Sequence, residues 1–306
     1  MKQYLDLLRD VYQNGVHKDP ARAGMPGTRE VFGRMMRFDL SEGFPLLTTK
    51  KMFTKGIVSE LLWFLKGNTN IKELLDNNNK IWVKDAYKFY CRRGGELPLE
   101  LWLPRVIEEK PETIRGSYTG FKYGECGDIY GKQWRRFGFT EFDQIDYIID
   151  AIKNRPNERY HIITSWDPEA FLGQYKHSAA LPSCHVFYQF NVTNGKLNMS
   201  MLQRSCDMLL GVPFDLAMCG LLLSIIANET DLIPGEFIWY GNSCHIYDNH
   251  ITQVEEQLTR EPFELCTLKI RNKVRPNGIY DYSVSDFVFE NYKCHPAIKA
   301  PLSVGI

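Results

Sequence analysis

A continuous apolar stretch from Leu216 to Ala227 constrains this chain more than any other feature of its sequence. The stretch is too short to cross a bilayer, which takes about 20 apolar residues, and it ends in a polar Asn-Glu-Thr tripeptide. We therefore predict a long helix, beginning near Phe214, that is buried in the core of a soluble protein. No membrane partner is expected.

The composition supports such a core. With 44% hydrophobic and 13% aromatic residues, this chain of 306 residues is neither disordered nor collagen-like. It is also long enough to form a core that needs no disulfides or bound metals for stability. Its 37 basic side chains balance 37 acidic ones, which argues against a broad basic surface. We therefore expect no nucleic-acid partner, and any bound phosphate should be held by a few placed residues.

The eight cysteines are scattered along the chain without a CxxC pair. The first residues, Met1–Asp10, are charged and lack the apolar segment of a secretory signal. These features predict reduced thiols in a cytoplasmic protein, with neither a disulfide framework nor a metal site. One of these thiols is a candidate for chemistry.

The spacing of apolar residues predicts a mixture of helices and strands. Helices are expected at residues 4–12, closed by Gly15, and at residues 57–65; strands are expected at residues 31–40, 185–192, 197–202 and 237–240, with a turn at Asn194-Gly195. These elements follow no strict βαβ alternation, which favours an α+β fold in one domain, residues 1–306. Between residues 88 and 125, glycines and prolines suggest a surface insertion rather than part of the core.

Two short segments carry residues suited to catalysis and to phosphate binding. Cys184 follows a Pro-Ser turn and precedes His185, so it is a candidate nucleophile whose thiolate nearby cations would favour. A buried structural thiol is the alternative. Arg204 and Ser205 supply a forked cation and a hydroxyl, a pair that suits a phosphate monoester but also occurs on ordinary surfaces.

Two carboxylates stand out by their surroundings. Glu60 is the single acid in an apolar helix, where an unpaired carboxylate is costly and usually has a partner or a function. Asp215 follows a Pro-Phe pair near the start of the long helix, and local rules favour the role of N-cap for it.

Ordered motifs along nearly the whole chain resemble the thymidylate synthase family. They are FPLLTTK (residues 44–50), ELLWFLKG (60–67), IW (81–82), YGKQWR (130–135), CH (184–185), QRSCDMLLGVPFDLA (203–217), HIY (245–247) and IKAP (298–301). The resemblance implies an α+β sandwich on a bent mixed sheet, and an obligate homodimer whose sheets pack back to back.

The resemblance also implies a reaction. Cys184 looks like the nucleophile that adds to C6 of a pyrimidine nucleoside monophosphate, so that C5 attacks a one-carbon unit from the folate co-substrate 5,10-methylenetetrahydrofolate. Glu60 resembles the carboxylate that relays protons through water, a role that needs a raised pKa. Tyr130 resembles the group that assists removal of the C5 proton, and His185 belongs with these catalytic residues.

Further positions match the binding residues of the family. Those for the phosphate are Arg22, Arg159, Arg204 and Ser205; those for the sugar are His245 and Tyr247; those for the folate are Trp82, Asp207 and the C-terminal Ile306. The phosphate site departs from the family pattern, because Tyr160 replaces a second arginine and Arg22 lies in a longer loop. The folate site also departs from it, because a tryptophan is missing near Asp85 and the tail runs past its usual end.

The departure with the clearest consequence is Asp215, where thymidylate synthases carry Asn. An Asn amide accepts from N3–H of uracil and donates to O4, whereas cytosine presents an acceptor at N3 and donors at N4. A neutral carboxylic acid at position 215 donates to N3 and accepts from N4, so Asp215 predicts a cytidylate substrate. The same residue marks the cytidylate hydroxymethylase branch that the chain resembles.

We therefore predict a deoxycytidylate 5-hydroxymethyltransferase, in which water adds to the exocyclic methylene after one-carbon transfer. The altered folate cover and the longer tail favour water over hydride. The alternatives are a dCMP 5-methyltransferase that releases dihydrofolate, a CMP hydroxymethylase, a thymidylate synthase acting on dUMP, and a non-catalytic homologue that binds nucleotide or RNA.

Overall fold

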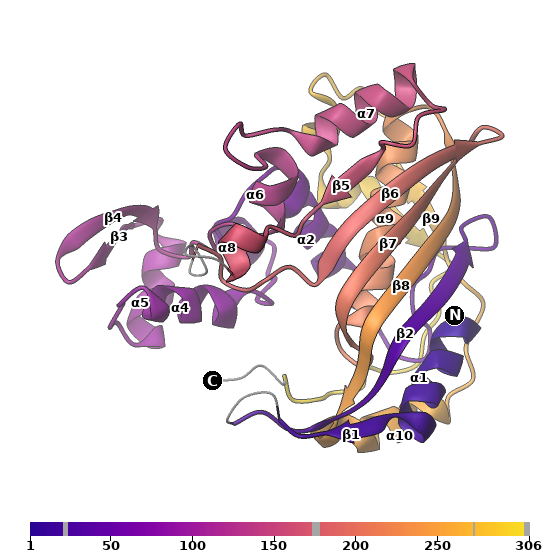
Figure 1. The fold of residues 1–306 in the computed structure, drawn as a ribbon, viewed down its shortest axis with the longest axis horizontal. Helices are drawn as coiled ribbons and strands as arrows, with labels where there is room; N and C mark the ends of the chain where they lie inside the picture. The colour runs from indigo at the N-terminus through magenta and orange to yellow at the C-terminus, as the bar shows by residue number, and fades with distance from the viewer. Residues whose placement is uncertain (21–23, 173–177, 272, 303–306) are drawn as a thin grey trace.

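A six-stranded sheet forms the body of the protein in the computed structural model, which describes residues 1–20, 24–172, 178–271 and 273–302 (Figure 1). Its strands lie in the order β1-β2-β8-β7-β6-β5. They span Val16–Lys18 (β1), Thr28–Asp39 (β2), Ile162–Thr164 (β5), His185–Thr193 (β6), Lys196–Asp207 (β7) and Ile233–Tyr247 (β8). The pairing of β7 with β8 is parallel and the others are antiparallel, so the sheet is mixed.

The hairpin of β6 and β7 confirms the predicted turn. Asn194 and Gly195 join the two strands with φ of 51° and 72°, the left-handed values that a tight two-residue hairpin turn needs. The register of this hairpin places His185 opposite Gln203. β7 and β8 extend beyond the apolar residues that predicted them, because their pairing continues into polar residues at their C-terminal ends.

The apolar stretch forms α9 (Val212–Glu229), which packs against β7 and β8 on one face of the sheet (Figure 1). This helix is long and apolar enough to cross a membrane, but 78% of it is buried inside the protein, which confirms the prediction of a core helix. It begins at Val212 with Gly211 as its N-cap. The expectation that Asp215 caps the helix is therefore wrong: Asp215 lies inside the first turn, where its side chain is available for other partners.

Shorter elements surround this core. They are α1 (Lys2–Asn14), α2 (Thr54–Leu65), α3 (Lys72–Asp76), α4 (Val83–Arg92), α5 (Leu99–Ile107), β3 (Pro111–Ile114), β4 (Ser117–Lys122), α6 (Tyr130–Arg135), α7 (Gln144–Asn154), α8 (Pro168–Leu172), α10 (Ile251–Leu258), β9 (Thr267–Ile270) and β10 (Phe287–Glu290). α1, α2 and β2 confirm the predicted N-terminal helices and strand. The α+β fold on a bent mixed sheet is confirmed as well.

The segment between residues 88 and 125 differs from its prediction. α4, α5 and the β3–β4 hairpin project from the sheet (Figure 1), yet the rings of Tyr87, Tyr90, Trp102 and Tyr123 pack together between them. Trp102 is 0% exposed. That this segment is an insertion stays a prediction, but these rings belong to the hydrophobic core, because the glycines and prolines separate short elements that still bury aromatic side chains.

One face of the sheet carries exposed apolar side chains. Tyr240 on β8, 41% exposed, pairs with Met35 on β2, 49% exposed, and in the strand alternation both lie on the face opposite the buried Phe237 and Trp239. Exposed apolar side chains on a sheet face are compatible with the expected back-to-back packing of two subunits. The homodimer and the single domain stay predictions.

Candidate active site

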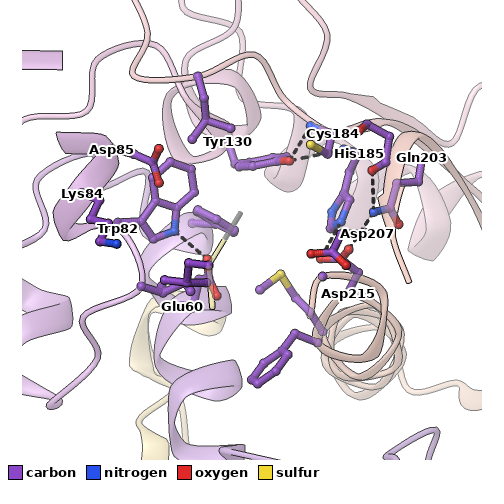
Figure 2. Close-up of a pocket in the computed structure, with 18 of the residues that line it drawn as sticks. Glu60, Trp82, Lys84, Asp85, Tyr130, Cys184, His185, Gln203, Asp207 and Asp215 are labelled. Atoms are coloured by element: carbon purple, nitrogen blue, oxygen red, sulfur yellow. Dashed lines mark hydrogen bonds and ion pairs between the residues drawn. The ribbon is translucent and has the colours of Figure 1, made fainter. Parts of the chain in front are cut away.

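A cavity of about 310 Å³ opens at the edge of the sheet where β6 begins and where β7 and β8 end. Figure 2 shows Glu60, Trp82 and Asp85 on one side of it and the residues around Cys184 and Asp215 on the other. The cavity is lined by Glu60, Phe64, Ile81, Trp82, Lys84, Asp85, Tyr130, Leu181, Cys184, His185, Gln203, Ser205, Asp207, Gly211, Phe214, Asp215, Met218, His245, Tyr247 and Leu302.

The loop that carries Cys184 is held by hydrogen bonds from two directions. The amide N–H of Cys184 donates to the Tyr130 hydroxyl oxygen at 2.7 Å, and the amide of His185 donates to the same oxygen at 3.3 Å. From β7, Arg204 donates through Nε and Nη2 to the carbonyls of the two residues before Cys184, each at 2.9 Å. Its Nη2 lies 3.9 Å from Cys184 Sγ. Cys184 is therefore positioned mainly through its backbone, and its role as the nucleophile stays a prediction.

Burial dominates the protonation of Cys184. It raises the pKa of the thiol to about 11, although the guanidinium of Arg204 lowers it. The carboxylates of Asp215 and Asp85 raise it further. Arg204 thus favours the thiolate as expected, but the loss of hydration outweighs this one cation and the pKa of the thiol is raised on balance.

The sequence assigned Arg204 to the phosphate, and the structure gives it a second role. Two of its three nitrogens hold the Cys184 loop, and the guanidinium lies over the Trp166 ring, with Cζ 5.5 Å from the ring centre. Its Nη1 makes no hydrogen bond to any residue that the structure describes. Arg204 does not line the cavity, whereas its neighbour Ser205 does. Phosphate binding by Arg204 stays a prediction.

Asp215 is the centre of a hydrogen-bonded chain on the sheet side of the cavity. Its Oδ2 accepts from Gln203 Nε2 at 2.7 Å, and its Oδ1 lies 3.1 Å from His185 Nε2 (Figure 2). Beyond these partners, Trp239 Nε1 donates to Gln203 Oε1 at 2.8 Å, and His185 Nδ1 lies 2.7 Å from the Tyr188 hydroxyl. The hairpin register and the first turn of α9 bring these side chains together.

Glu60 lies across the cavity, inside the apolar helix α2. Burial raises the pKa of its carboxyl to about 7. The hydrogen bond from Trp82 Nε1 to Glu60 Oε1, at 2.6 Å, lowers the pKa, while the carboxylate of Asp215 raises it and the imidazole of His185 lowers it whenever that ring is protonated. The raised pKa expected of a proton relay is confirmed, since this carboxyl can take up and release a proton near neutral pH.

Tyr130 begins α6 at the top of the cavity in Figure 2. Burial raises the pKa of its phenol well above the usual range. Tyr130 therefore stays protonated near neutral pH, and it can assist removal of the C5 proton only as a hydroxyl group. That role stays a prediction.

Four of the residues expected at the sugar and the folate line the same cavity: His245, Tyr247, Trp82 and Asp207. The parallel register of β7 and β8 places Asp207 beside His245, and Tyr247 follows at the end of β8. Asp207 Oδ1 accepts from the amides of residues 209 and 210, at 3.0 and 3.2 Å, which fixes the turn into α9. The indole of Trp82 offers an apolar surface of the kind that a folate ring requires.

Among the predicted site residues that the structure describes, Arg159 and Arg204 do not line this cavity. Arg22 and Ile306 lie outside the described residues. Arg159 is exposed. Among the described residues, no three His, Cys, Asp or Glu side chains gather as a metal site would need.

Sequence reasoning missed Gln203 as a site residue and Lys84 as a residue that lines the cavity. Gln203 was quoted as the first residue of a motif, but its alternation with Ser205 and Asp207 along a strand was the signal that it faces the same side. Lys84 adjoins Asp85 at the start of α4, and both enter the cavity (Figure 2).

Comparisons with known proteins agree with this arrangement. The family described as thymidylate synthase matches residues 2–304. A thymidylate synthase of Francisella philomiragia is 45% identical over 312 residues, which cover 99% of this chain and 100% of that protein. A thymidylate synthase of Francisella tularensis has the same identity and coverage. One of Listeria monocytogenes is 42% identical over 323 residues, which cover 99% of this chain and 100% of that protein.

Proposed function

This chain belongs to the thymidylate synthase family, whose enzymes transfer a one-carbon unit from 5,10-methylenetetrahydrofolate to C5 of a pyrimidine nucleotide, and we propose that its own substrate is dCMP and its product 5-hydroxymethyl-dCMP. The proposal depends on one observation: the carboxyl of Asp215 lines the cavity, on the side formed by the sheet.

Base preference follows from the hydrogen bonds that Asp215 has available. Its Oδ2 accepts from Gln203, and Oδ1 faces His185, so the side chain cannot rotate without breaking these contacts. A carboxyl here accepts from the amino group of cytosine and shares a proton with the basic N3. Uracil instead presents O4, which sets one acceptor against another and costs about 1–3 kcal/mol.

The same contact assists the attack by Cys184. A proton shared between Asp215 and N3 withdraws electron density from the ring, which makes C6 more electrophilic. The C6–S bond then forms as the thiol gives up its proton, and C5 gains the electron pair with which it takes the one-carbon unit. Glu60, with its pKa of about 7, is suited to pass these protons through water.

The wall around Trp82 supports water addition. Asp85 and Lys84 place a carboxylate and an ammonium group at the cavity. Burial raises the pKa of Asp85, and its carboxylate has no hydrogen-bond partner among the described residues. A charged wall of this kind retains water near the exocyclic methylene. The water oxygen bonds to the methylene carbon as the water loses a proton to solvent, and the electron pair of the methylene double bond moves to C5. This pair then re-forms the C5–C6 double bond as the C6–S bond breaks, which frees the Cys184 sulfur and leaves the hydroxymethyl group on C5.

A second function is supported by the names of the relatives. All three are called thymidylate synthase, which favours methylation of dUMP at C5 with release of dihydrofolate. Methylation of dCMP and hydroxymethylation of CMP are the remaining alternatives, since each shares either the base or the product group with the proposed reaction.

Mass spectrometry of the nucleotide products tests the proposal. The protein is incubated with 5,10-methylenetetrahydrofolate and, in separate reactions, dCMP, CMP and dUMP. Gain of one CH₂O unit by dCMP supports the proposal; gain of one CH₂ unit, with dihydrofolate absorbance, identifies methylation. Turnover of dUMP alone overturns the assignment of Asp215. A Cys184→Ala variant is the matched control and should give no product.

A further inference from the structure

Five side chains form one continuous hydrogen-bonded chain beneath the base end of the cavity. Tyr188 and His185 come from β6, Asp215 from α9, Gln203 from β7 and Trp239 from β8. The two ends of this chain are buried and make no contact with the cavity, since Tyr188 is 1% exposed and Trp239 is 0% exposed. Neither residue has a role in the reaction described above.

The direction of the hydrogen bonds is fixed at the Trp239 end. An indole N–H is a donor only, so Gln203 Oε1 accepts from it. The amide nitrogen of Gln203 must then face the other way, where it donates to Asp215 Oδ2 at 2.7 Å and to the carbonyl of Ser205 at 3.1 Å. Both hydrogens of the amide are used, and Asp215 Oδ2 is an acceptor.

The direction of the hydrogen bond is also fixed at the Tyr188 end of the chain. Burial raises the pKa of its phenol well above the usual range, so the hydroxyl keeps its hydrogen. Within the described residues, that hydrogen has one acceptor in reach, Nδ1 of His185 at 2.7 Å. Leaving a buried hydroxyl without an acceptor is costly, so Tyr188 donates to Nδ1.

We propose that Tyr188 is a positioning residue that holds His185 in the neutral tautomer with its hydrogen on Nε2, so that His185 donates to Asp215 and sets the base preference of the site. Both oxygens of Asp215 then accept hydrogen bonds, one from each side. A carboxyl in this state is a carboxylate. The proton that pairs it with cytosine N3 is therefore acquired when the base binds, not stored on Asp215 beforehand. The effect on base preference rests on the proposed function, whereas the tautomer does not.

Other groups that face His185 leave this assignment intact. Tyr130 on α6 presents its ring, with the centres of the two rings 5.5 Å apart, while its hydroxyl oxygen is occupied by the amides of Cys184 and His185. Glu60 on α2 lies across the cavity, and its hydrogen bond among the described residues is with Trp82 rather than with His185. Neither supplies a second donor to Nδ1.

Nitrogen-15 NMR of the protein labelled at histidine tests the tautomer without any substrate. The spectrum is recorded at about pH 8, where neutral rings dominate, and His185 is assigned by its loss in a His185→Gln variant. We expect hydrogen on Nε2 in the parent protein. A ring with hydrogen on Nδ1, or a cationic ring, overturns the proposal even if no Tyr188 variant folds. Tyr188→Phe should give a mixture of tautomers, and an unchanged spectrum in this variant also overturns it.

The ratio of kcat/KM for dCMP to that for dUMP tests the consequence. Tyr188→Phe should lower this ratio by about tenfold, the value of one net hydrogen bond, with a smaller change in KM for folate. Tyr282→Phe is the matched control, because this buried hydroxyl bonds Glu229 and Asn228 away from the cavity, and it should leave the ratio unchanged. An unchanged ratio in Tyr188→Phe overturns the link to base preference. A parent protein that is inactive on dCMP refutes the proposed function, while the NMR result still decides the tautomer.

Discussion

The two sides of the cavity are built differently. On the sheet side, Asp215 is held by His185 and Gln203, and each of these is held by a further buried side chain. On the helix side, Glu60 has a single hydrogen bond, from Trp82, and Asp85 has none among the described residues (Figure 2).

This difference separates two tasks. A side chain with fixed partners on both oxygens presents one pattern of acceptors, which suits selection of a base. A buried carboxyl with one partner and a pKa of about 7 changes protonation readily, which suits proton transfer. We expect changes on the sheet side to alter which nucleotide reacts, and changes on the helix side to alter how fast it reacts.

Replacing Cys184, which both sides of the cavity face, should have the largest effect on activity. Cys184→Ser should lower turnover on the order of 10⁶-fold, because a serine hydroxyl is a far weaker nucleophile toward C6. Release of tritium from 5-labelled nucleotide measures the loss, and mass spectrometry should find no covalent adduct. The exposed Cys91→Ser is the control and should keep full activity. Comparable activity in the two variants would exclude Cys184 as the nucleophile.

On the helix side, Glu60→Gln should lower kcat by about 10³-fold, since the amide cannot carry a proton. The ratio between dCMP and dUMP should stay close to that of the parent protein. Steady-state kinetics with both nucleotides measures the two quantities together. A changed ratio with unchanged kcat would reverse the division of tasks between the two sides.

On the sheet side, Asp215→Asn should shift the ratio of kcat/KM from dCMP toward dUMP by about 10- to 100-fold, because the amide donates where cytosine N4 also donates. The hydrogen bond from Gln203 survives in this variant, since the amide oxygen can still accept it. Competition between the two nucleotides in one reaction measures the shift. An unchanged preference would show that another residue reads the base.

The smallest expected effect is on stability. The pKa of Glu60 is about 7 in the folded protein and about 4.5 in an unfolded chain, so the native state binds more protons between these values. The free energy of unfolding therefore falls as pH rises through this window, by about 1–3 kcal/mol.

Urea denaturation at about pH 5 and about pH 8 measures this dependence. Glu60→Gln should remove it, so that the variant gains stability relative to the parent protein at the higher pH. The exposed Glu264→Gln is the control and should follow the parent protein at both values. Parallel curves for the parent protein and Glu60→Gln would contradict the raised pKa.

The sequence predicted correctly those elements that can be recognised from their own residues, without knowledge of what they pack against. The Asn194-Gly195 turn and the apolar helix α9 needed only their own residues to be recognised. The core around Trp102 was missed, because it forms between short elements whose glycines and prolines read as loop. Gln203 was missed as a site residue because its partners, Asp215 and Trp239, come from two other elements.

The chain's sequence determined the family and the candidate reacting groups: a thiol at Cys184, a carboxyl in an apolar helix at Glu60, and an acid at position 215. Tertiary structure decided their states. The thiol of Cys184 has a raised pKa despite its cation, and the side chain of Asp215 bonds His185 and Gln203 instead of capping α9. Proton affinity and hydrogen-bond direction depend on burial and on partners from distant segments, so they arise only when the sheet brings β6, β7 and α9 together.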